Sequence, residues 1–299
     1  MDKNIVFVIG NGFDLDLGLN TNYESFFRSS FWPFRKTRKG LGAWLNKKAT
    51  QENWYDLECM LREYACSENR TCEYDSKWDK RQFNLLKDKI GEFLSVAENK
   101  EIRKILIASN LIWWLDAYWR NTHVYTFNYT NFQKILNDLG IENHVNYSYV
   151  HGSLSSQTQI LGIDDNINVR EDYEFFIKQN QPQYSSQSLI QDLDKADSVI
   201  FFGLSMGDID LPYFRDFFHK RSTENLSESK KKFIYFFTKD SIGEEGVRKN
   251  LRTLGNDTLM YLHSYNVMEF FYTQENRWSC DDKIDEYFNH KLNLFLNLT

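Results

Sequence analysis

Residues 5–19 read IVFVIGNGFDLDLGL, an apolar run followed at once by closely spaced glycines. The run Ile5–Ile9 is apolar at consecutive positions, which is typical of a strand buried on both faces of a parallel sheet. Gly10, Gly12 and Gly18 are three of only 14 glycines in 299 residues. A strand, a Gly-x-Gly turn and a helix together form the arrangement that binds phosphate at a helix N-terminus. The spacing departs from G-x-G-x-x-G, so a tight turn without a ligand explains these glycines at least as well.

The bulk composition indicates a globular protein and argues against two classes of partner. Hydrophobic residues make up 41% of the chain, aromatic residues make up 16%, and there are only 3 prolines. The net charge of -6 provides no overall attraction to nucleic acid or to an anionic membrane, so we expect neither partner. No apolar segment is long enough for a membrane helix, and we find no secretory signal.

The four cysteines also bear on the class of protein. Cys59, Cys66, Cys72 and Cys280 are irregularly spaced and form no C-x-x-C pair. This spacing suggests neither a zinc site nor a disulfide framework. We therefore expect reduced thiols, a cytoplasmic location and no metal.

Seven short runs rich in β-branched and aromatic residues predict strands. Helical segments separate most of them, which favours a parallel sheet with helices on both faces. The predicted fold is therefore α/β and Rossmann-like. The seven runs are Ile5–Ile9, Val124–Phe127, Tyr147–Val150, Ile160–Ile163, Val199–Phe202, Phe233–Phe237 and Leu259–Leu262.

The long interval between the first two predicted strands has only helical periodicity. Apolar residues recur there on helical faces, for example over residues 83–97. We therefore predict an inserted helical module over residues 23–120, and a Rossmann-like domain formed by residues 1–22 and 121–299. A terminal helix is expected over Asp281–Leu296.

Helix caps support this division. Thr21 with Glu24 and Ser241 with Glu244 fit capping boxes, and Thr130 could cap a helix that Gly140 would close.

Polar and small residues follow three further predicted strands. The second strand ends in the sequence Thr126–Thr130, the third in His151-Gly152 and the fifth in Gly203–Asp208. Open α/β sheets bind ligands at the carboxyl ends of their strands. Four such ends at one edge are hard to explain as turns alone, so the sequence predicts a binding site there.

The same stretches carry a family resemblance that spans most of the chain. GNGFDLDLGL, NWYDLE, TFNYT, HGSL and FFGLSMGDID resemble the bacteriophage abortive-infection AbiH family. At the strand ends only, their order is similar to that of the sirtuin-like NAD-binding fold. The sirtuin motif G-A-G-x-S-x-x-x-G-I-P-D-F-R is similar to residues 10–23, and T-Q-N-x-D, H-G and G-T-S resemble Thr126–Thr130, His151-Gly152 and Gly203–Ser205.

The departures from the sirtuin pattern limit what the resemblance implies. The sirtuin serine falls on Asp14, the arginine falls on Tyr23, and the zinc module with paired cysteines is absent. The missing module argues against a protein deacylase. The resemblance does imply NAD handling, and relatives of this fold in phage defence are associated with NAD hydrolysis.

Asn128 and His151 are the two candidate catalytic residues. NAD cleavage breaks a C–N glycosidic bond, and the amide of Asn128 can both donate to and accept from a ribose hydroxyl. His151, with an ordinary pKa near ~6.5, could act as general base. The alternatives are that Asn128 caps the next helix and that His151 is a turn residue.

Further residues are candidates for cofactor binding or an accessory role. Asp14 could accept a hydrogen bond from a ribose hydroxyl or serve as a helix N-terminal carboxylate. Ser205 could hold a phosphate or ribose, or cap the helix that starts near Asp208. Glu58 could lie over the cleft and orient the nicotinamide ribose, or belong to a solvated acidic face. The cofactor-binding candidates are Gly10, Asn11, Gly12, Asp14, Thr126, Gly203, Ser205 and Asp208, and the accessory candidates are Glu58 and Tyr23.

Two functions remain open from the sequence. The first is an NAD glycohydrolase that acts as an abortive-infection effector, with NAD as its substrate. The second is a module that senses ADP-ribose or a related nucleotide without turnover and signals to a partner. A nuclease has little support, because the sequence offers neither a convincing carboxylate cluster nor a basic stripe. We also expect a homo-oligomer or a partner protein of the defence system, because aromatic residues are abundant and are enriched at interfaces.

Overall fold

A computed structural model describes the chain over ten segments, and the account below concerns these alone. They are residues 4–51, 56–66, 75–104, 107–117, 119–141, 145–163, 169–181, 187–223, 231–255 and 257–274.

A six-stranded sheet in which every pairing is parallel forms the centre of the molecule. The strand order is β3-β2-β1-β4-β5-β6, so β1 lies inside the sheet and the chain crosses over between β3 and β4. All five residues of β1 are buried, as the unbroken apolar run predicts. The α/β, Rossmann-like fold with a parallel sheet is therefore confirmed. The strands are β1 (Ile5–Ile9), β2 (Thr122–Thr126), β3 (Asn146–Tyr149), β4 (Ser198–Phe202), β5 (Phe233–Thr238) and β6 (Val267–Tyr272).

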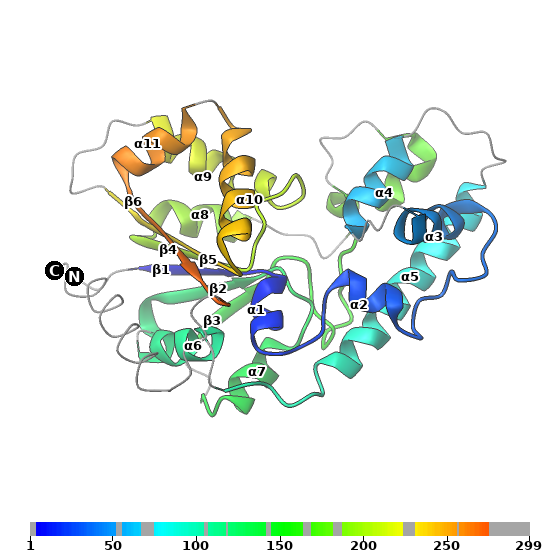
Figure 1. The fold of residues 1–299 in the computed structure, drawn as a ribbon, viewed down its shortest axis with the longest axis horizontal. Coiled ribbons are helices and arrows are strands. Elements are labelled where there is room, and N and C mark those ends of the chain that lie inside the picture. The colour runs from blue at the N-terminus through cyan, green and yellow to red at the C-terminus, as the bar shows by residue number, and fades with distance from the viewer. Residues whose placement is uncertain are drawn as a thin grey trace.

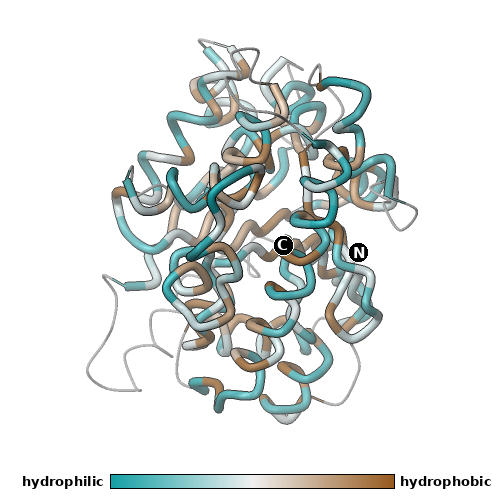
Figure 2. Tube along the Cα trace, turned by 90° about the vertical axis from the view of Figure 1, so that its right-hand side faces the viewer, coloured by the Kyte–Doolittle hydropathy of each residue, from teal (hydrophilic) through white to brown (hydrophobic). Residues whose placement is uncertain are grey.

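Helices cover both faces of the sheet (Figure 1). One face packs against α1 (Asn11–Asp16), α6 (Ile107–Ala117) and α7 (Phe132–Asp138), and their apolar residues form one core cluster with the strands. The other face packs against α8 (Gln187–Lys195), α9 (Leu211–Thr223), α10 (Ser241–Arg252) and α11 (Thr258–Tyr265), which form a second cluster. Figure 2 shows hydrophobic stretches of the chain running through the interior between these layers.

A third core cluster lies beside the sheet and belongs to the helical module. It contains residues of α2 (Tyr23–Arg28), α3 (Gly40–Gln51), α4 (Leu57–Cys66) and α5 (Ser76–Ala97). Residues of the short 3-10 helix η2 (Glu171–Phe176), which comes much later in the chain, complete it, and η3 (Lys178–Asn180) follows directly. The helix α6 instead packs with the sheet. The 3-10 helix η1 (Trp119–Asn121) lies between α6 and β2 in the chain. The proposed domain limits stay a prediction.

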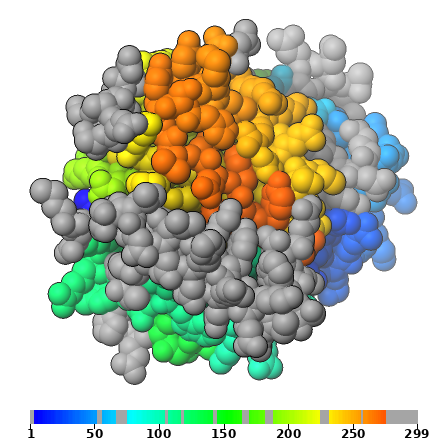
Figure 3. All heavy atoms as spheres, turned by 60° about the vertical axis from the view of Figure 1, so that its left-hand side comes forward, coloured from blue at the N-terminus to red at the C-terminus, as the bar shows by residue number. Residues whose placement is uncertain are grey.

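Two of the expected strands are absent from the structure, and one observed strand was not expected. Ile160–Ile163 forms no strand and makes a single bridge, Ile163 to Ile177. Leu259–Leu262 lies inside helix α11, and the strand that follows it, β6, was not predicted. β6 is an edge strand whose Glu269 is exposed, so it lacks the continuous apolar run of the central strands. On the side of the molecule in Figure 3, β6 and α11 lie at the surface next to α10.

The helix caps differ by one residue from those expected. Asn22, Asn131 and Asp240 are the N-caps of α2, α7 and α10, each accepting a hydrogen bond from a backbone N–H of the first turn. Thr21, Thr130 and Ser241 therefore do not cap these helices. Gly140, with φ of 75°, does follow the end of α7 as expected. The predicted terminal helix Asp281–Leu296 lies outside the described residues.

Candidate functional site

A cavity of about 740 Å³ lies at the carboxyl ends of the strands. Residues after β1, β2, β3, β4 and β5 form one wall, and residues of α2, α4 and α5 form the other. Nearly all the predicted site residues line it: Gly10, Asn11, Gly12, Asp14, Tyr23, Glu58, Asn128, His151, Gly203, Ser205 and Asp208. Thr126 is the exception. It is buried, and its hydroxyl accepts a hydrogen bond from the backbone N–H of Asn128 at 3.1 Å.

The glycines after β1 allow two backbone segments to touch. The N–H of Gly10 donates to Phe202 O at 2.8 Å, and that of Gly12 donates to Gly203 O at 3.1 Å. A Cβ on Gly12 would lie 2.5 Å from the Cα of Gly203, which itself has φ of 66°. Both N–H groups are used within the protein, so a phosphate bound at this turn would need other donors.

Asn128 is fixed by a buried network that includes Asp14. Its Nδ2 donates to Gly10 O at 3.0 Å and to Asp14 Oδ1 at 2.8 Å. The other carboxylate oxygen of Asp14 accepts from Thr130 Oγ1 at 2.9 Å. Burial raises the pKa of Asp14 to about 7, against the opposing effect of the Thr130 and Asn128 hydrogen bonds. Asp14 therefore orients Asn128, and with both amide hydrogens used, the carbonyl oxygen of Asn128 is the end left for a ligand.

Asn11 and Ser205 are held in place on the opposite sides of the Gly12–Gly203 contact. Thr21 Oγ1 donates to Asn11 Oδ1 at 2.6 Å, which ties the start of α1 to the loop before α2. The carbonyl of Ser205 accepts from Asn250 Nδ2 of α10 at 3.0 Å, and its hydroxyl accepts from the Gly207 N–H at 3.2 Å. The Ser205 hydroxyl therefore stabilises a local turn and does not cap α9.

His151 is a buried histidine, with 5% of its surface exposed. Its Nε2 lies 3.0 Å from the hydroxyl of Tyr213 in α9, and its ring packs edge-on against Phe127 with centroids 5.0 Å apart. Burial, and secondarily the positive charge of Lys178, lowers the pKa of His151 well below 6.5. The imidazole is consequently neutral at pH 7, so it can accept a proton, although as a weaker base than an exposed histidine.

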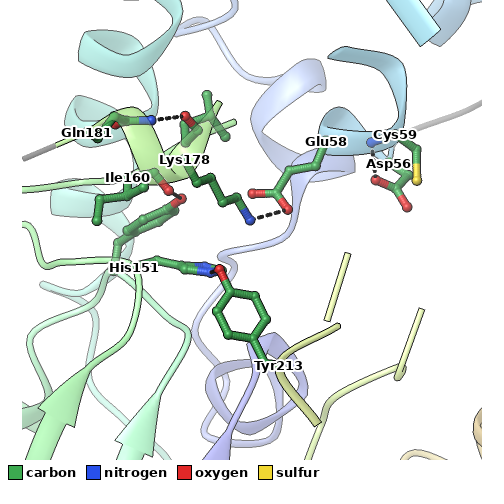
Figure 4. A network of polar contacts seen from close by, with 10 residues as sticks. Asp56, Glu58, Cys59, His151, Ile160, Lys178, Gln181 and Tyr213 are labelled. Atoms are coloured by element: carbon green, nitrogen blue, oxygen red, sulfur yellow. Dashed lines mark hydrogen bonds and ion pairs between the residues drawn. The ribbon is translucent and has the colours of Figure 1, made fainter. Parts of the chain in front are cut away.

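Glu58, near the start of α4, faces the same part of the cavity (Figure 4). Its Oε2 pairs with Lys178 Nζ at 3.0 Å. Burial raises the pKa of Glu58 to about 7, opposed by the charge and hydrogen bond of Lys178. Tyr23 also lines the cavity. The predicted alternative of a solvated acidic face does not hold for Glu58, which is 8% exposed. Residues 53–55 of the NWYDLE motif lie outside the described residues.

Several residues that contact the predicted site residues could not be recognised as site residues from a sequence motif. Lys178 and Tyr213 lie in ordinary apolar stretches, FFIKQN and LPYFRDFF, that resemble no motif. Thr130 was assigned only a capping role, although its spacing of two residues from Asn128 at a strand end could have suggested a position in the network. Two further lining residues are Thr238, the last residue of β5, and Lys239, which follows it, and the end of this strand shows no glycine or motif.

The charges in the cavity are unevenly distributed. Six carboxylates line it, and Lys239 is the basic side chain among the described lining residues. Asp56 and Asp210 lie near enough to Glu58 to raise its pKa, which places these three on one side. Lys239 follows β5 on the α10 side, near Gly243 and Asn250. The carboxylates are Asp14, Glu24, Asp56, Glu58, Asp208 and Asp210.

Two kinds of feature are absent from the part of the chain that the structure describes, a metal site and a membrane-spanning helix. No group of three or more His, Cys, Asp or Glu residues there could hold a metal ion. No described helix combines the length and apolar character needed to cross a bilayer.

Comparison with known proteins identifies one family. The family model for bacteriophage abortive infection AbiH matches residues 6–235, which run from β1 into β5 and include every predicted site residue. No curated protein matches the chain. The match extends over more than half of the 299 residues and contains the whole set of strand-end motifs that form the cavity. This chain belongs to the bacteriophage abortive infection AbiH family.

Proposed function

We propose that this protein is an NAD glycohydrolase that acts in abortive infection by cleaving the bond between nicotinamide and ribose. The main support is the convergence of Asn128, His151 and the glycine turn in one cavity, although they lie far apart in the sequence. A volume of about 740 Å³ is within the usual range for sites that bind small molecules and cofactors. Family membership supports the defence role.

The proposed reaction is a hydrolysis through a transition state with oxocarbenium character. The C1′–N bond of the nicotinamide riboside breaks, and its electron pair neutralises the pyridinium nitrogen. A water oxygen bonds to C1′ and passes its proton to His151, which then releases it to solvent. The products are nicotinamide, ADP-ribose and a proton.

Each site residue has a role in this proposal. The carbonyl oxygen of Asn128 accepts a hydrogen bond from a ribose hydroxyl, while Asp14 orients the amide. Glu58 faces the same sugar and stabilises the positive charge that develops on it. Tyr23 lies beside this end of the cavity. Hydrogen bonding or general-base assistance at such positions is typically worth ~10²–10⁴-fold in rate.

The distribution of charge supports one orientation of NAD. The nicotinamide ring is cationic and suits the side where Asp56, Glu58 and Asp210 lie. The pyrophosphate is anionic and suits the side of Lys239. The segment from Gly203 to Asp208, between these two sides, then contacts the phosphates and the adenosine ribose.

The direct test is to incubate purified protein with NAD and to measure free nicotinamide. We expect His151→Ala and Asn128→Ala to reduce its release by ~10²-fold or more while the proteins stay folded. His219→Ala is the matched control, because His219 is exposed on α9. Absence of release by the wild type and by every activated form, together with an unchanged cellular effect of His151→Ala, would refute the proposal.

One observation favours the alternative function, a nucleotide sensor without turnover. The Nε2 of His151 is already engaged with Tyr213, and burial weakens the imidazole as a base. A sensor would bind ADP-ribose in calorimetry, release no nicotinamide from NAD, and keep its affinity in His151→Ala. A glycohydrolase would lose turnover in the same variant.

A further inference from the structure

Lys178 is a fully buried lysine, and its ammonium group lies next to the cavity. None of its side-chain surface is exposed, and its partner Glu58 has 11% of its side chain exposed. Removing two opposite charges from water costs several kcal/mol per ion, which only good geometry and further hydrogen bonds offset. Replacing such a pair by apolar side chains of similar volume is often neutral or stabilising, so a buried pair is weak evidence for a purely structural role. The pair therefore calls for an explanation in terms of the site.

A continuous chain of hydrogen bonds fixes Lys178 relative to His151. The Lys178 N–H donates to Ile163 O at 2.8 Å, and the Ile160 N–H donates to His151 O at 2.8 Å. The three-residue step from Ile160 to Ile163 joins the two bonds. The Tyr129 hydroxyl holds the same segment by donating to Ile160 O at 2.8 Å.

The segment passes too close to its neighbour to allow a side chain at one point. Gly162 has φ of 153°, and a Cβ there would lie 2.0 Å from Phe176 O and 3.4 Å from Lys178 Cγ. Gln181 Nε2 closes the other side by donating to Leu161 O at 2.8 Å. The backbone around Lys178 is thus built to hold this lysine at a fixed place.

The positive charge of Lys178 lowers the pKa values of both Glu58 and His151, which favours a charged carboxylate and an uncharged imidazole. A nearby cation favours an ionised carboxylate and disfavours a protonated imidazole. Burial alone would leave Glu58 neutral, and Lys178 opposes that effect. At His151 the charge of Lys178 and burial both lower the pKa of the imidazole. A site in which the environment separates the protonation states of two groups provides one charged group and one neutral base.

The other charged or titratable groups near this pair come from several elements of the described residues. Tyr23 of α2 and Tyr129 after β2 lie near Glu58, whose negative charge adds to burial in raising the pKa values of both hydroxyls. Asp56 beside α4 and Asp210 before α9 face Glu58, and their negative charges favour its protonated form. Tyr213 of α9 contacts His151. Lys178 is the cation that acts on both groups.

We propose that Lys178 is a positioning residue of the cavity, which favours the ionised form of the Glu58 carboxyl beside the ligand and the neutral form of the His151 imidazole. Figure 4 shows its side chain reaching across to Glu58 above the contact between His151 and Tyr213. For NAD cleavage the inference rests on the proposed function, because it explains how Glu58 can face the cationic ribose while His151 accepts a proton. The protonation states themselves exist without a ligand and can be measured in the free protein.

The test follows the ring nitrogens of His151 by NMR over a range of pH, with the signals assigned by their loss in His151→Ala. In Lys178→Met we expect the midpoint of the His151 titration to rise by about one pH unit, because a nearby opposing charge has been removed. Lys220→Met is the matched control, since Lys220 forms an exposed pair with Asp194 at 3.4 Å. The control should leave the titration unchanged.

A second variant separates positioning from folding. The double variant Glu58→Gln with Lys178→Met removes both charges, so it leaves no unpaired buried ion and should unfold at a temperature closer to that of the wild type than Lys178→Met does. We expect its His151 titration to rise as well, and nicotinamide release not to be restored. An unchanged His151 titration in whichever variant folds, or full recovery of release in the double variant, would overturn the proposal. If the wild type releases no nicotinamide, the glycohydrolase proposal fails, and the titration still decides the role of Lys178.

Discussion

Asp14 lies in the first turn of α1 and lines the cavity, as its sequence context suggested, and its carboxylate is engaged by neighbouring side chains. Its carboxylate oxygens accept hydrogen bonds from Asn128 and Thr130, so it acts on a ligand through Asn128. Burial of this carboxyl raises its pKa to about 7. The raised pKa makes the free energy of unfolding depend on pH.

We expect the free energy of unfolding to fall as the pH rises from about 4 to about 7, in part because of Asp14. In this window the unfolded chain has lost the Asp14 proton, whose ordinary pKa is 3.8, while the folded protein retains it. The contribution is about 4 kcal/mol at most, since one pKa unit corresponds to about 1.4 kcal/mol. Asp14→Asn should reduce the difference in unfolding free energy between pH 5 and pH 8. Denaturant unfolding at both values provides the measurement.

Asp216→Asn is the control for this experiment, because Asp216 is exposed on α9. The same pH dependence in Asp14→Asn and in the wild type would contradict the assignment. Asp14→Asn should also weaken ligand binding, because an amide offers one acceptor oxygen where the carboxylate offers two.

Nicotinamide release by the wild type should increase from pH 6 to pH 8, with a midpoint near 7. Burial raises the pKa values of both Asp14 and Glu58 to about 7, and both act in their ionised forms. The pKa of His151 is lowered well below 6.5, so the loss of its proton adds no further rise in rate within this range. Rates measured across the range in the wild type and in Glu58→Gln test this. The variant should be slower and should keep only the dependence due to Asp14, and a rate that decreases with pH would argue against these roles.

At the level of residues, the sequence could predict those that stand at strand ends. Asn128 and His151 follow β2 and β3, and the topology of a parallel sheet brings such positions to one edge. Lys178 could not be predicted in this way. It reaches the site only through the contact of η3 with residues 160–163, a feature of tertiary packing that leaves no periodic pattern.

At the level of elements, the contact between the β1–α1 turn and the end of β4 is the most constrained part of the site. Gly12→Ala should lower the unfolding temperature, because the new Cβ would lie 2.5 Å from the Cα of Gly203, which belongs to the backbone and cannot rotate away. Gly246→Ala is the matched control: a Cβ there meets nothing within 4 Å, and alanine is preferred in a helix by roughly 0.5–1 kcal/mol. Thermal unfolding of both variants checks the prediction. Equal stability of Gly12→Ala and the wild type would contradict the close backbone contact.

The elements that the sequence predicted correctly are those whose apolar residues follow a pattern that fits one kind of element, either strand or helix. β1, β4 and β5 are continuous apolar runs in the middle of the sheet, and α5 has a regular apolar face. The failures come from short apolar runs that fit either a helix or a strand. Leu259–Leu262 is four apolar residues long and belongs to α11, where burial of Leu259 and Leu262 follows helical spacing.

For the whole molecule, we expect self-association in solution. Ile242 on α10 and Met260 on α11 are 77% and 55% exposed, and an interface between copies that covered them would remove their apolar surface from water. Sedimentation velocity over a range of protein concentrations measures the mass directly. A strictly monomeric species with full activity would contradict the expectation.

The walls of the cavity come from residues as early as Gly10 and as late as Asn250. During translation, therefore, the pocket does not exist until the ribosome has released the segment that forms α10. A nascent chain that already displays every one of the amino-terminal motifs still lacks this part of the cavity wall. The wall is completed when α10 packs beside Ser205, whose carbonyl accepts a hydrogen bond from Asn250 Nδ2.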